Sequence, residues 1–169
     1  MPRTLHLDFE TASEINIKTA GTYKYAMHPS TRVLMAGYAL DHHAPDLWVP
    51  AEGEEMPRAL FDALVDPDTE VHAFNAKFER LILWHVLKIR VPIERFRCTM
   101  VHAWSLSFSG SLGAVGAQMG LPLDKVKDAR GKKLIDKFCK PAPKNHKADW
   151  YGPDNAPADW AAFKAYCIQ

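Results

Sequence analysis

The chain has few cysteines, no long apolar run and almost no net charge. Its three cysteines are odd in number and widely spaced, which excludes a disulfide framework and a zinc-binding spacing. This cysteine usage indicates a reducing, cytoplasmic compartment. No apolar stretch approaches the roughly 18 residues of a membrane span, and the first residues do not resemble a signal peptide. We therefore expect no membrane partner.

The composition is that of a folded domain. Hydrophobic residues make up 47% of the chain and charged residues 24%, which is typical of a globular protein rather than a disordered one. At 169 residues the chain has the size of one ordinary domain with its own core. The formal net charge of +1 does not by itself indicate a nucleic-acid partner.

The positive charge is concentrated in one segment, residues 124–147. This segment carries nine Lys or Arg against three Asp, a net charge of +6, so the rest of the chain carries −5. Such asymmetry indicates a polyanion that meets one surface of the protein. A solvated, lysine-rich connector would give the same pattern, and the sequence leaves both interpretations open. The basic residues are Lys125, Lys127, Arg130, Lys132, Lys133, Lys137, Lys140, Lys144 and Lys147.

The stretch at residues 5–11 alternates apolar and polar residues, which predicts a strand. Asp8 and Glu10 then emerge on one face, about 6–7 Å apart along the strand. Two carboxylates this close raise each other's pKa unless a cation lies between them, and Mg²⁺ or Mn²⁺ prefers such oxygen ligands. The alternative is that both acids simply face water on an amphipathic strand.

A second polar group follows another predicted strand, residues 70–74. Asn75 opens a predicted helix, and we expect its side chain to cap the first free N–H groups. Glu79 falls one turn later on the same side, near the edge of the sheet. The helix dipole stabilises a carboxylate at this position without any catalytic duty, so a purely structural role stays open.

The remaining pattern alternates strands and helices, which predicts an α/β fold. The helix at 97–108 is expected to bury Met100, Val101, Trp104 and Leu106. The last helix is expected to turn Trp160, Phe163 and Cys167 inward. Further strands are expected at 33–40 and 46–49, and further helices at 56–65, 112–119 and 158–168.

Several motifs occur together in a fixed order. Asp-Phe-Glu-Thr stands at 8–11, Asn-Ala-Lys-Phe-Glu at 75–79 and Tyr-Cys-Ile-Gln at 166–169. In this order they resemble the proofreading 3′–5′ exonucleases of the DEDD class, tyrosine subtype. Arg-Cys-Thr-Met at 97–100 and Gly-Lys-Lys-Leu-Ile at 131–135 make the chain similar to the N-terminal exonuclease domain of phage and prophage family A DNA polymerases.

The resemblance implies a ribonuclease H-like α/β fold with a central mixed sheet flanked by helices. It also implies that residues 1–169 form a single 3′–5′ exonuclease domain that removes 5′-nucleotides from DNA by two-metal hydrolysis. The cofactors would be two Mg²⁺ or Mn²⁺ ions. The partners would be a single-stranded or frayed DNA 3′ end and a polymerase module of the same full-length chain, in the cytoplasm of a bacterial host if the gene is phage-encoded.

The resemblance also assigns roles to single residues. Asp8 would bridge both ions, Glu10 would bind one, and Glu79 would hold the second through water. Tyr166 would orient the attacking water. Thr11 and Asn75 would contact the terminal nucleotide, and residues 125–147 would provide a basic groove for the single strand.

Two departures from the class pattern shape the expectation for this chain. The class has Asp where this chain has Glu79, and the chain stops at Gln169, immediately before the position of the last Asp of the class. We therefore expect a truncated domain with impaired activity. A non-catalytic DNA-binding or positioning domain of a polymerase is the main alternative, and a ribonuclease H-like endonuclease or an RNA-trimming exonuclease is a more distant one.

Overall fold

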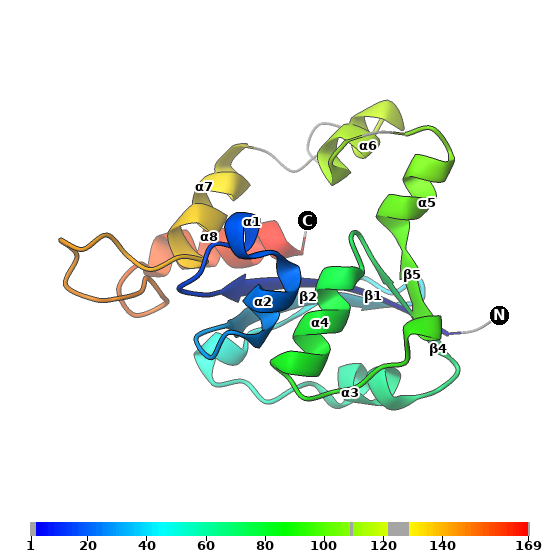
Figure 1. Ribbon diagram of the computed structural model, residues 1–169, viewed down its shortest axis with the longest axis horizontal. Helices are drawn as coiled ribbons and strands as arrows, with labels where there is room; N and C mark the ends of the chain where they lie inside the picture. Colours follow the sequence, from blue (N-terminus) through cyan, green and yellow to red (C-terminus); the bar gives the residue numbers. More distant parts are fainter. Residues whose placement is uncertain (1–2, 109, 122–128, 169) are drawn as a thin grey trace.

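A five-stranded mixed sheet forms the centre of the protein (Figure 1). The computed structural model describes residues 3–108, 110–121 and 129–168. The strand order is β3-β2-β1-β4-β5, with β2 antiparallel to both neighbours and β1, β4 and β5 parallel. This is a ribonuclease H-like arrangement, so the expected fold class is confirmed. The strands are β1 (Arg3–Ala12), β2 (Arg32–Leu40), β3 (Asp46–Trp48), β4 (Thr69–Ala73) and β5 (Phe96–Cys98).

Helices cover both faces of the sheet. Helices α2, α3 and α4 pack on one face, and α7 and α8 pack on the other. None of the helices that the structure describes is both long enough and apolar enough to cross a membrane. The helices are α1 (Ile17–Ala20), α2 (Thr22–Met27), α3 (Arg58–Val65), α4 (Lys77–His85), α5 (Thr99–Ser105), α6 (Leu112–Gln118), α7 (Ala129–Phe138) and α8 (Pro157–Cys167), with 3₁₀ turns at Pro50–Glu52 and Ile93–Arg95.

The sheet separates two hydrophobic cores. Leu5, Leu7 and Phe9 of β1 are buried against α2, α3 and α4, as the alternating pattern predicts. On the other face, Phe138 of α7 and Phe163 of α8 are completely buried. Burying each such side chain contributes about 1.5–3 kcal/mol to stability, so α7 and α8 are firmly attached to the sheet.

The pairing of β1 with β2 positions the acidic residues. Asp8 lies opposite Gly37, and Glu10 lies opposite Met35. The next pair joins Thr11 to Val33, so Leu34 is an extra residue on β2 and the ladder contains a β-bulge. Thr11 and Ala12 are both buried after the bulge, whereas Asp8 is exposed before it.

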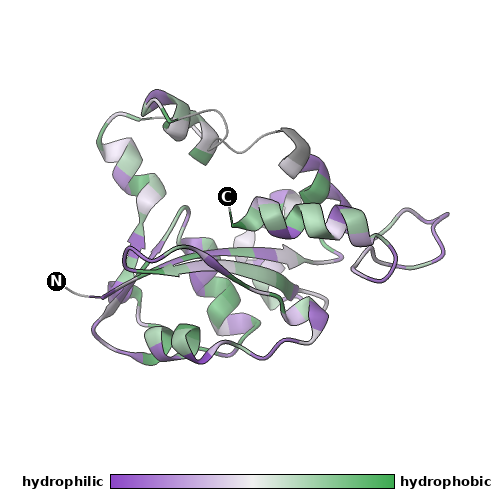
Figure 2. Cartoon of the chain, turned by 180° about the vertical axis from the view of Figure 1, so that it is seen from behind, coloured by the Kyte–Doolittle hydropathy of each residue, from purple (hydrophilic) through white to green (hydrophobic). Residues whose placement is uncertain are grey.

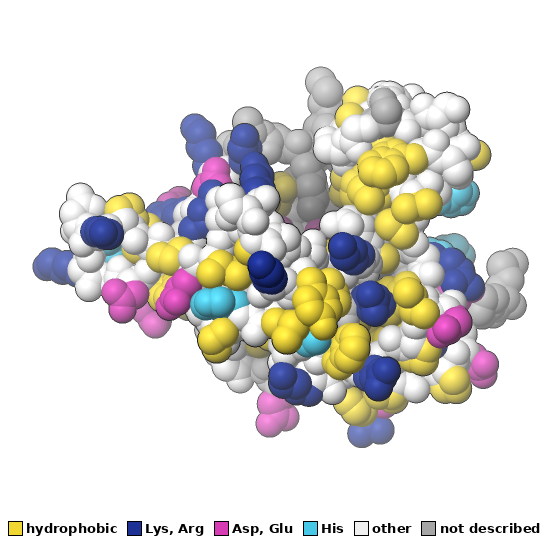
Figure 3. Space-filling view, viewed as in Figure 1, with side chains coloured by type: hydrophobic (Ala, Val, Ile, Leu, Met, Phe, Trp, Pro, Cys, Tyr) yellow, Lys and Arg dark blue, Asp and Glu magenta, His cyan; other side chains and the backbone are white. Residues whose placement is uncertain are grey.

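The segment after β4 corrects two predictions. Phe96–Cys98 is the short strand β5, so the helix begins at Thr99 rather than at Arg97. The predicted core of this helix is also wrong, because Val101, Trp104 and Leu106 are 56%, 51% and 61% exposed. Helices α5 and α6 lead away from the sheet, as Figure 2 shows from behind, and Figure 3 shows apolar side chains gathered over them.

Candidate active site

Asp8 lines a cavity of about 300 Å³ on the α8 side of the sheet. The cavity is lined by Thr99 of α5, Leu112 of α6 and Cys167 and Ile168 at the end of α8. The Asp8 side chain is exposed, because the polar positions of β1 face this cavity rather than the core. Residues far apart in the sequence thus meet around one carboxylate.

Glu79 lies in the first turn of α4 and is only 2% exposed. Its neighbours Leu81 and Ile82 are buried in the core, so the helix turn that carries Glu79 also packs against the protein interior. Burial, and then the negative charge of Asp8, raise the pKa of Glu79 well above its usual range, and hydrogen bonds from the backbone N–H groups of Glu79 and Phe9 oppose this rise. Oε2 of Glu79 has no hydrogen-bond partner among the residues that the structure describes. A buried carboxyl with a like charge beside it and an unsatisfied oxygen fits a bound cation.

Glu10 makes a contact that the sequence did not predict. Its Oε2 atom accepts a weak hydrogen bond from the thiol of Cys139, with 3.9 Å between sulfur and oxygen. Burial, reinforced by the charge of Glu10, raises the pKa of the Cys139 thiol. Cys139 directly follows Phe138, the buried residue at the end of α7. That buried neighbour is the one sequence signal that could have placed this thiol near the sheet.

The structure does not bring the three predicted metal-binding carboxylates together as one metal-binding cluster. Within residues 3–108, 110–121 and 129–168, no group of three or more His, Cys, Asp or Glu is arranged to hold a metal ion. The structure brings Asp8 and Glu79 close enough to influence each other, and it brings Glu10 to Cys139.

Thr11, a predicted substrate contact, is buried and hydrogen-bonded. Its hydroxyl shares a 2.9 Å hydrogen bond with the phenol of Tyr25. Burial raises the pKa of Tyr25 to about 12, and the bond to Thr11 opposes this rise. The Thr11 hydroxyl therefore has a partner inside the protein.

Asn75, the other predicted substrate contact, is exposed at the turn between β4 and α4. The prediction that its side chain caps the helix is wrong, because the capping residue is Ala76 and no side chain caps this end. The backbone N–H of Phe78 instead donates to the Asn75 carbonyl, at 2.8 Å. Asn75 has a φ of +73°, a left-handed conformation that Asn tolerates better than most residues.

Tyr166 lies in the last turn of α8 and is half-buried. Its ring is nearly parallel to that of Phe163, at an angle of 16° and a centroid distance of 6.4 Å. The next residues, Cys167 and Ile168, line the cavity that Asp8 enters. Gln169, the last residue of the motif, lies outside the described residues.

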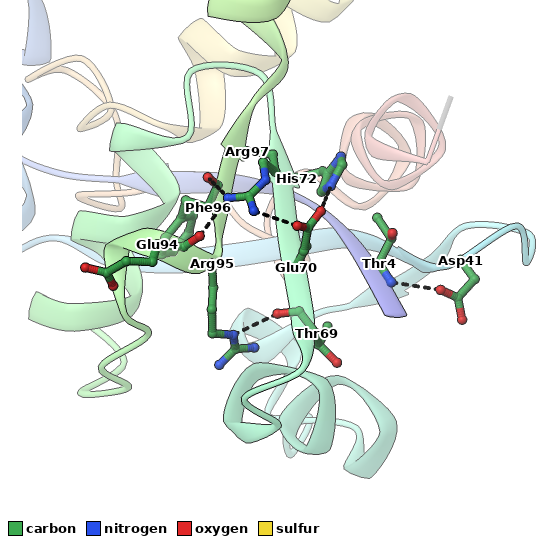
Figure 4. Close-up of polar contacts among 9 residues, drawn as sticks. All are labelled: Thr4, Asp41, Thr69, Glu70, His72, Glu94, Arg95, Phe96 and Arg97. Carbon is green, nitrogen blue, oxygen red and sulfur yellow. Dashed lines mark hydrogen bonds and ion pairs between the residues drawn. The ribbon is translucent and has the colours of Figure 1, made fainter. Parts of the chain in front are cut away.

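Two histidines lie beside Asp8 in the same cavity. His6 precedes Asp8 by two residues on β1, and it pairs with His72 of β4, with 5.5 Å between ring centroids. Glu70 accepts hydrogen bonds from Arg97 at 2.6 Å and from Nε2 of His72 at 3.2 Å (Figure 4). Burial, followed by the charge of His72, lowers the pKa of His6. The period of β1 places His6 and Asp8 on one face, a signal that sequence reasoning did not use.

The basic segment is partly neutralised within the fold. Lys137 forms a 2.5 Å ion pair with Asp159 of α8, and Lys140 pairs with Asp136. Lys132 and Lys133 of α7 are exposed. Lys125 and Lys127, which belong to the predicted basic groove, lie outside the described residues.

The chain is similar along its whole length to part of a phage DNA polymerase. It is 34% identical to the DNA polymerase of Bacillus phage SP02 over an alignment of 170 residues, which covers 99% of this chain and 26% of the polymerase. The chain therefore spans about a quarter of the length of that relative. No protein-family model matches the chain.

Two solved structures are similar to the chain at low sequence identity. One, described as the apo form of a nuclease, is 13% identical, with a TM-score of 0.49 over 98% of this chain and 66% of that chain. The other, Brucella melitensis NrnC, is 14% identical, with a TM-score of 0.48 over 95% of this chain and 66% of that chain. The chain thus covers just under two thirds of each, and the fold assignment rests on its own strand order.

Proposed function

We propose that this chain is a metal-dependent 3′–5′ exonuclease domain that removes 5′-nucleotides from DNA 3′ ends. The observation that carries the proposal is the buried carboxyl of Glu79, which lies beside Asp8 and has an unpartnered Oε2 among the described residues. The similarity to part of a phage DNA polymerase supports the same conclusion. Proofreading, with a polymerase module in the same full-length protein, is the biological role we infer.

Asp8, Glu10 and Glu79 are the residues that would hold divalent ions. Their oxygens are the ligands that Mg²⁺ and Mn²⁺ prefer. A cation between Asp8 and Glu79 would oppose both burial and the charge of Asp8, which raise the pKa of Glu79. When bound, a pair of such ions acidifies the attacking water and stabilises the entering and leaving oxygens of an in-line displacement.

The other side chains would position the DNA end and the water. Tyr166 would orient the attacking water from the last turn of α8, and Asn75 would contact the terminal nucleotide from its exposed turn. Thr11 would support this end of β1 through its hydrogen bond with Tyr25. The exposed Lys132 and Lys133 would contact phosphates of a single strand.

Selectivity for mispaired ends would come from the ease of unpairing. A mismatched 3′ end costs less energy to separate than a matched one, so it enters a single-strand site more often. We therefore expect faster digestion of mismatched than of matched ends, without any readout of the bases.

Digestion of a 3′-labelled single-stranded DNA with Mg²⁺ or Mn²⁺ tests the proposal. We expect weak, stepwise release of 5′-nucleotides by this chain and loss of that activity in the Asp8→Ala variant. Circular single-stranded DNA and an RNA oligonucleotide of the same sequence serve as controls. Cleavage of the circle would indicate an endonuclease, preference for RNA would indicate an RNA-trimming enzyme, and equal activity in the Asp8→Ala variant would contradict the proposed site.

A non-catalytic DNA-binding domain is the second candidate. It is favoured by the lack of a three-residue metal cluster among the described residues. Binding of Mn²⁺, followed by electron paramagnetic resonance, separates the two candidates. An exonuclease site binds the ion in the unaltered chain and loses it in the Asp8→Ala variant, whereas a DNA-binding module shows DNA affinity without any Mn²⁺ dependence.

A further inference from the structure

Two glycines lie where helix α8 contacts its neighbours. Gly37 belongs to β2 and Gly131 to α7, so they contact α8 from the sheet and from the adjacent helix. They are 94 residues apart in the sequence, yet both contacts involve the turn of α8 that carries Tyr166 and Cys167. This turn also lines the cavity that Asp8 enters.

Gly37 allows the end of α8 to lie directly on the sheet. It pairs with Asp8 across the antiparallel ladder, and paired residues project to the same face. A Cβ atom at position 37 would lie 2.8 Å from the backbone carbonyl oxygen of Cys167, closer than the 3.0 Å that real Cβ atoms respect. Since the obstacle is backbone, any larger residue would displace the last turn of α8 from the strand.

Gly131 allows the ring of Tyr166 to lie against the backbone of α7. A Cβ atom at position 131 would lie 2.0 Å from Cε2 and 2.4 Å from Cζ of that ring. Gly131 is the third residue of α7, and since glycine favours helix formation less than alanine does, helix formation does not explain its presence. Phe138 and the ion pair of Lys137 with Asp159 hold α7 against α8, which prevents α7 from simply moving away.

We propose that Gly37 and Gly131 are positioning residues for Tyr166. Gly37 sets the depth of the α8 end above Asp8, and Gly131 sets the place of the Tyr166 ring beside α7. The inference rests on the proposed function, because that function gives Tyr166 its role toward the attacking water. A Cβ atom at position 131 would lie 2.0 Å from Cε2 of Tyr166, about 1 Å inside the 3.0 Å that real Cβ atoms respect, and a misplacement of about 1 Å can cost about 100-fold in rate.

A double-mutant cycle tests Gly131. We expect Gly131→Ala to lower kcat for 3′-end digestion by about 10- to 100-fold with little change in KM. In the Tyr166→Ala background the ring is gone and the new Cβ fits, so we expect Gly131→Ala to cause no further loss. Gly152→Ala is the matched control, because a Cβ there meets nothing within 4 Å. Gly37→Ala is expected to lower kcat by a smaller factor through a separate contact, because its Cβ atom would lie 2.8 Å from the Cys167 carbonyl oxygen, so the test does not depend on the folding of one variant.

A measurement without catalysis completes the test. Nitration of Tyr166 by tetranitromethane, mapped by mass spectrometry, is expected to rise in Gly131→Ala and to stay unchanged in Gly152→Ala. Two results would overturn the inference. One is unchanged digestion and nitration in both Gly131→Ala and Gly37→Ala. The other is that Gly131→Ala lowers kcat as much in the Tyr166→Ala background as it does in the unaltered chain. No digestion by the unaltered chain, together with the expected rise in nitration, would reject the proposed exonuclease and keep the assigned packing.

Discussion

Helix α8, which packs on the sheet, and helix α5, in the α5–α6 arm that leads away from the sheet, both carry apolar patterns but differ in the burial of their apolar residues. Trp160 of α8 is 2% exposed and packs edge-on against Phe138, whereas Trp104 of α5 is 51% exposed. Both tryptophans belong to helical apolar patterns that predict a buried face. The difference teaches that the pattern identifies a helix, while the position of the helix relative to the sheet decides whether its apolar face is covered.

The largest expected contrast is in stability. Phe163→Ala removes a completely buried ring that stacks on Phe138, so we expect a loss of about 3–5 kcal/mol in the free energy of unfolding. Trp104→Ala in the arm is expected to change it by about 0.5 kcal/mol or less. Urea denaturation of both variants measures the contrast. Similar losses in the two variants would show that α5 is covered in solution.

A smaller effect on stability is expected for a substitution of Glu79. The pKa of Glu79 is raised in the folded state. At pH values between the unfolded pKa of about 4.3 and the folded pKa, the native state binds more protons than the unfolded state. The stability of the protein therefore falls as the pH rises through this range. At neutral pH we expect Glu79→Gln to be about 1–3 kcal/mol more stable than the unaltered chain.

Thermal melts across pH, with and without Mn²⁺, check this expectation. Mn²⁺ is expected to raise the Tm of the unaltered chain more than that of Glu79→Gln, because the ion stabilises the charged carboxylate. Equal pH profiles for the two proteins would contradict the buried, charge-opposed environment of Glu79.

The smallest effect compares a thiol from each region. Burial acts to raise the pKa of Cys98, at the start of α5, but hydrogen bonds from the backbone N–H groups of Val101, Ala76, Asn75 and Met100 lower it below the usual value. Burial and Glu10 raise the pKa of Cys139. Since the thiolate is the reactive form, we expect iodoacetamide at neutral pH to label Cys98 before Cys139. Mass spectrometry of the labelled peptides measures the order, and faster labelling of Cys139 would contradict its burial.

Local patterns predicted much of the fold. The alternation in β1 gave the correct buried residues, and the inward positions of Trp160 and Phe163 in α8 are confirmed. The strand β5 was missed because three residues are too few to show a period. The exposure of α5 was missed because it depends on where the chain leaves the sheet, and no residue within the helix encodes that direction.

The candidate site was predictable only in part. Asp8 lies within β1 and Glu79 lies in the helix that follows the neighbouring strand β4, and the charge of Asp8 acts on Glu79. The contact of Glu10 with Cys139 joins residues 129 positions apart, and the contact of Gly131 with Tyr166 depends on the crossing of two helices. Such contacts leave no local period in the sequence, so they required the structure. The metal-binding and catalytic roles themselves stay predictions.

The bulge opposite Glu10 and Thr11 changes which residues of β2 face the α7–α8 core. Because Leu34 is the extra residue, Leu34 and Met35 are consecutive in β2 and both pack in the α7–α8 core, whereas Val33 packs in the core on the other face. Deleting Leu34 would restore a regular ladder and remove one buried apolar side chain from the α7–α8 core. One extra residue on β2 thus adds an anchoring contact for α7 and α8 directly beside the strand that carries Asp8 and Glu10.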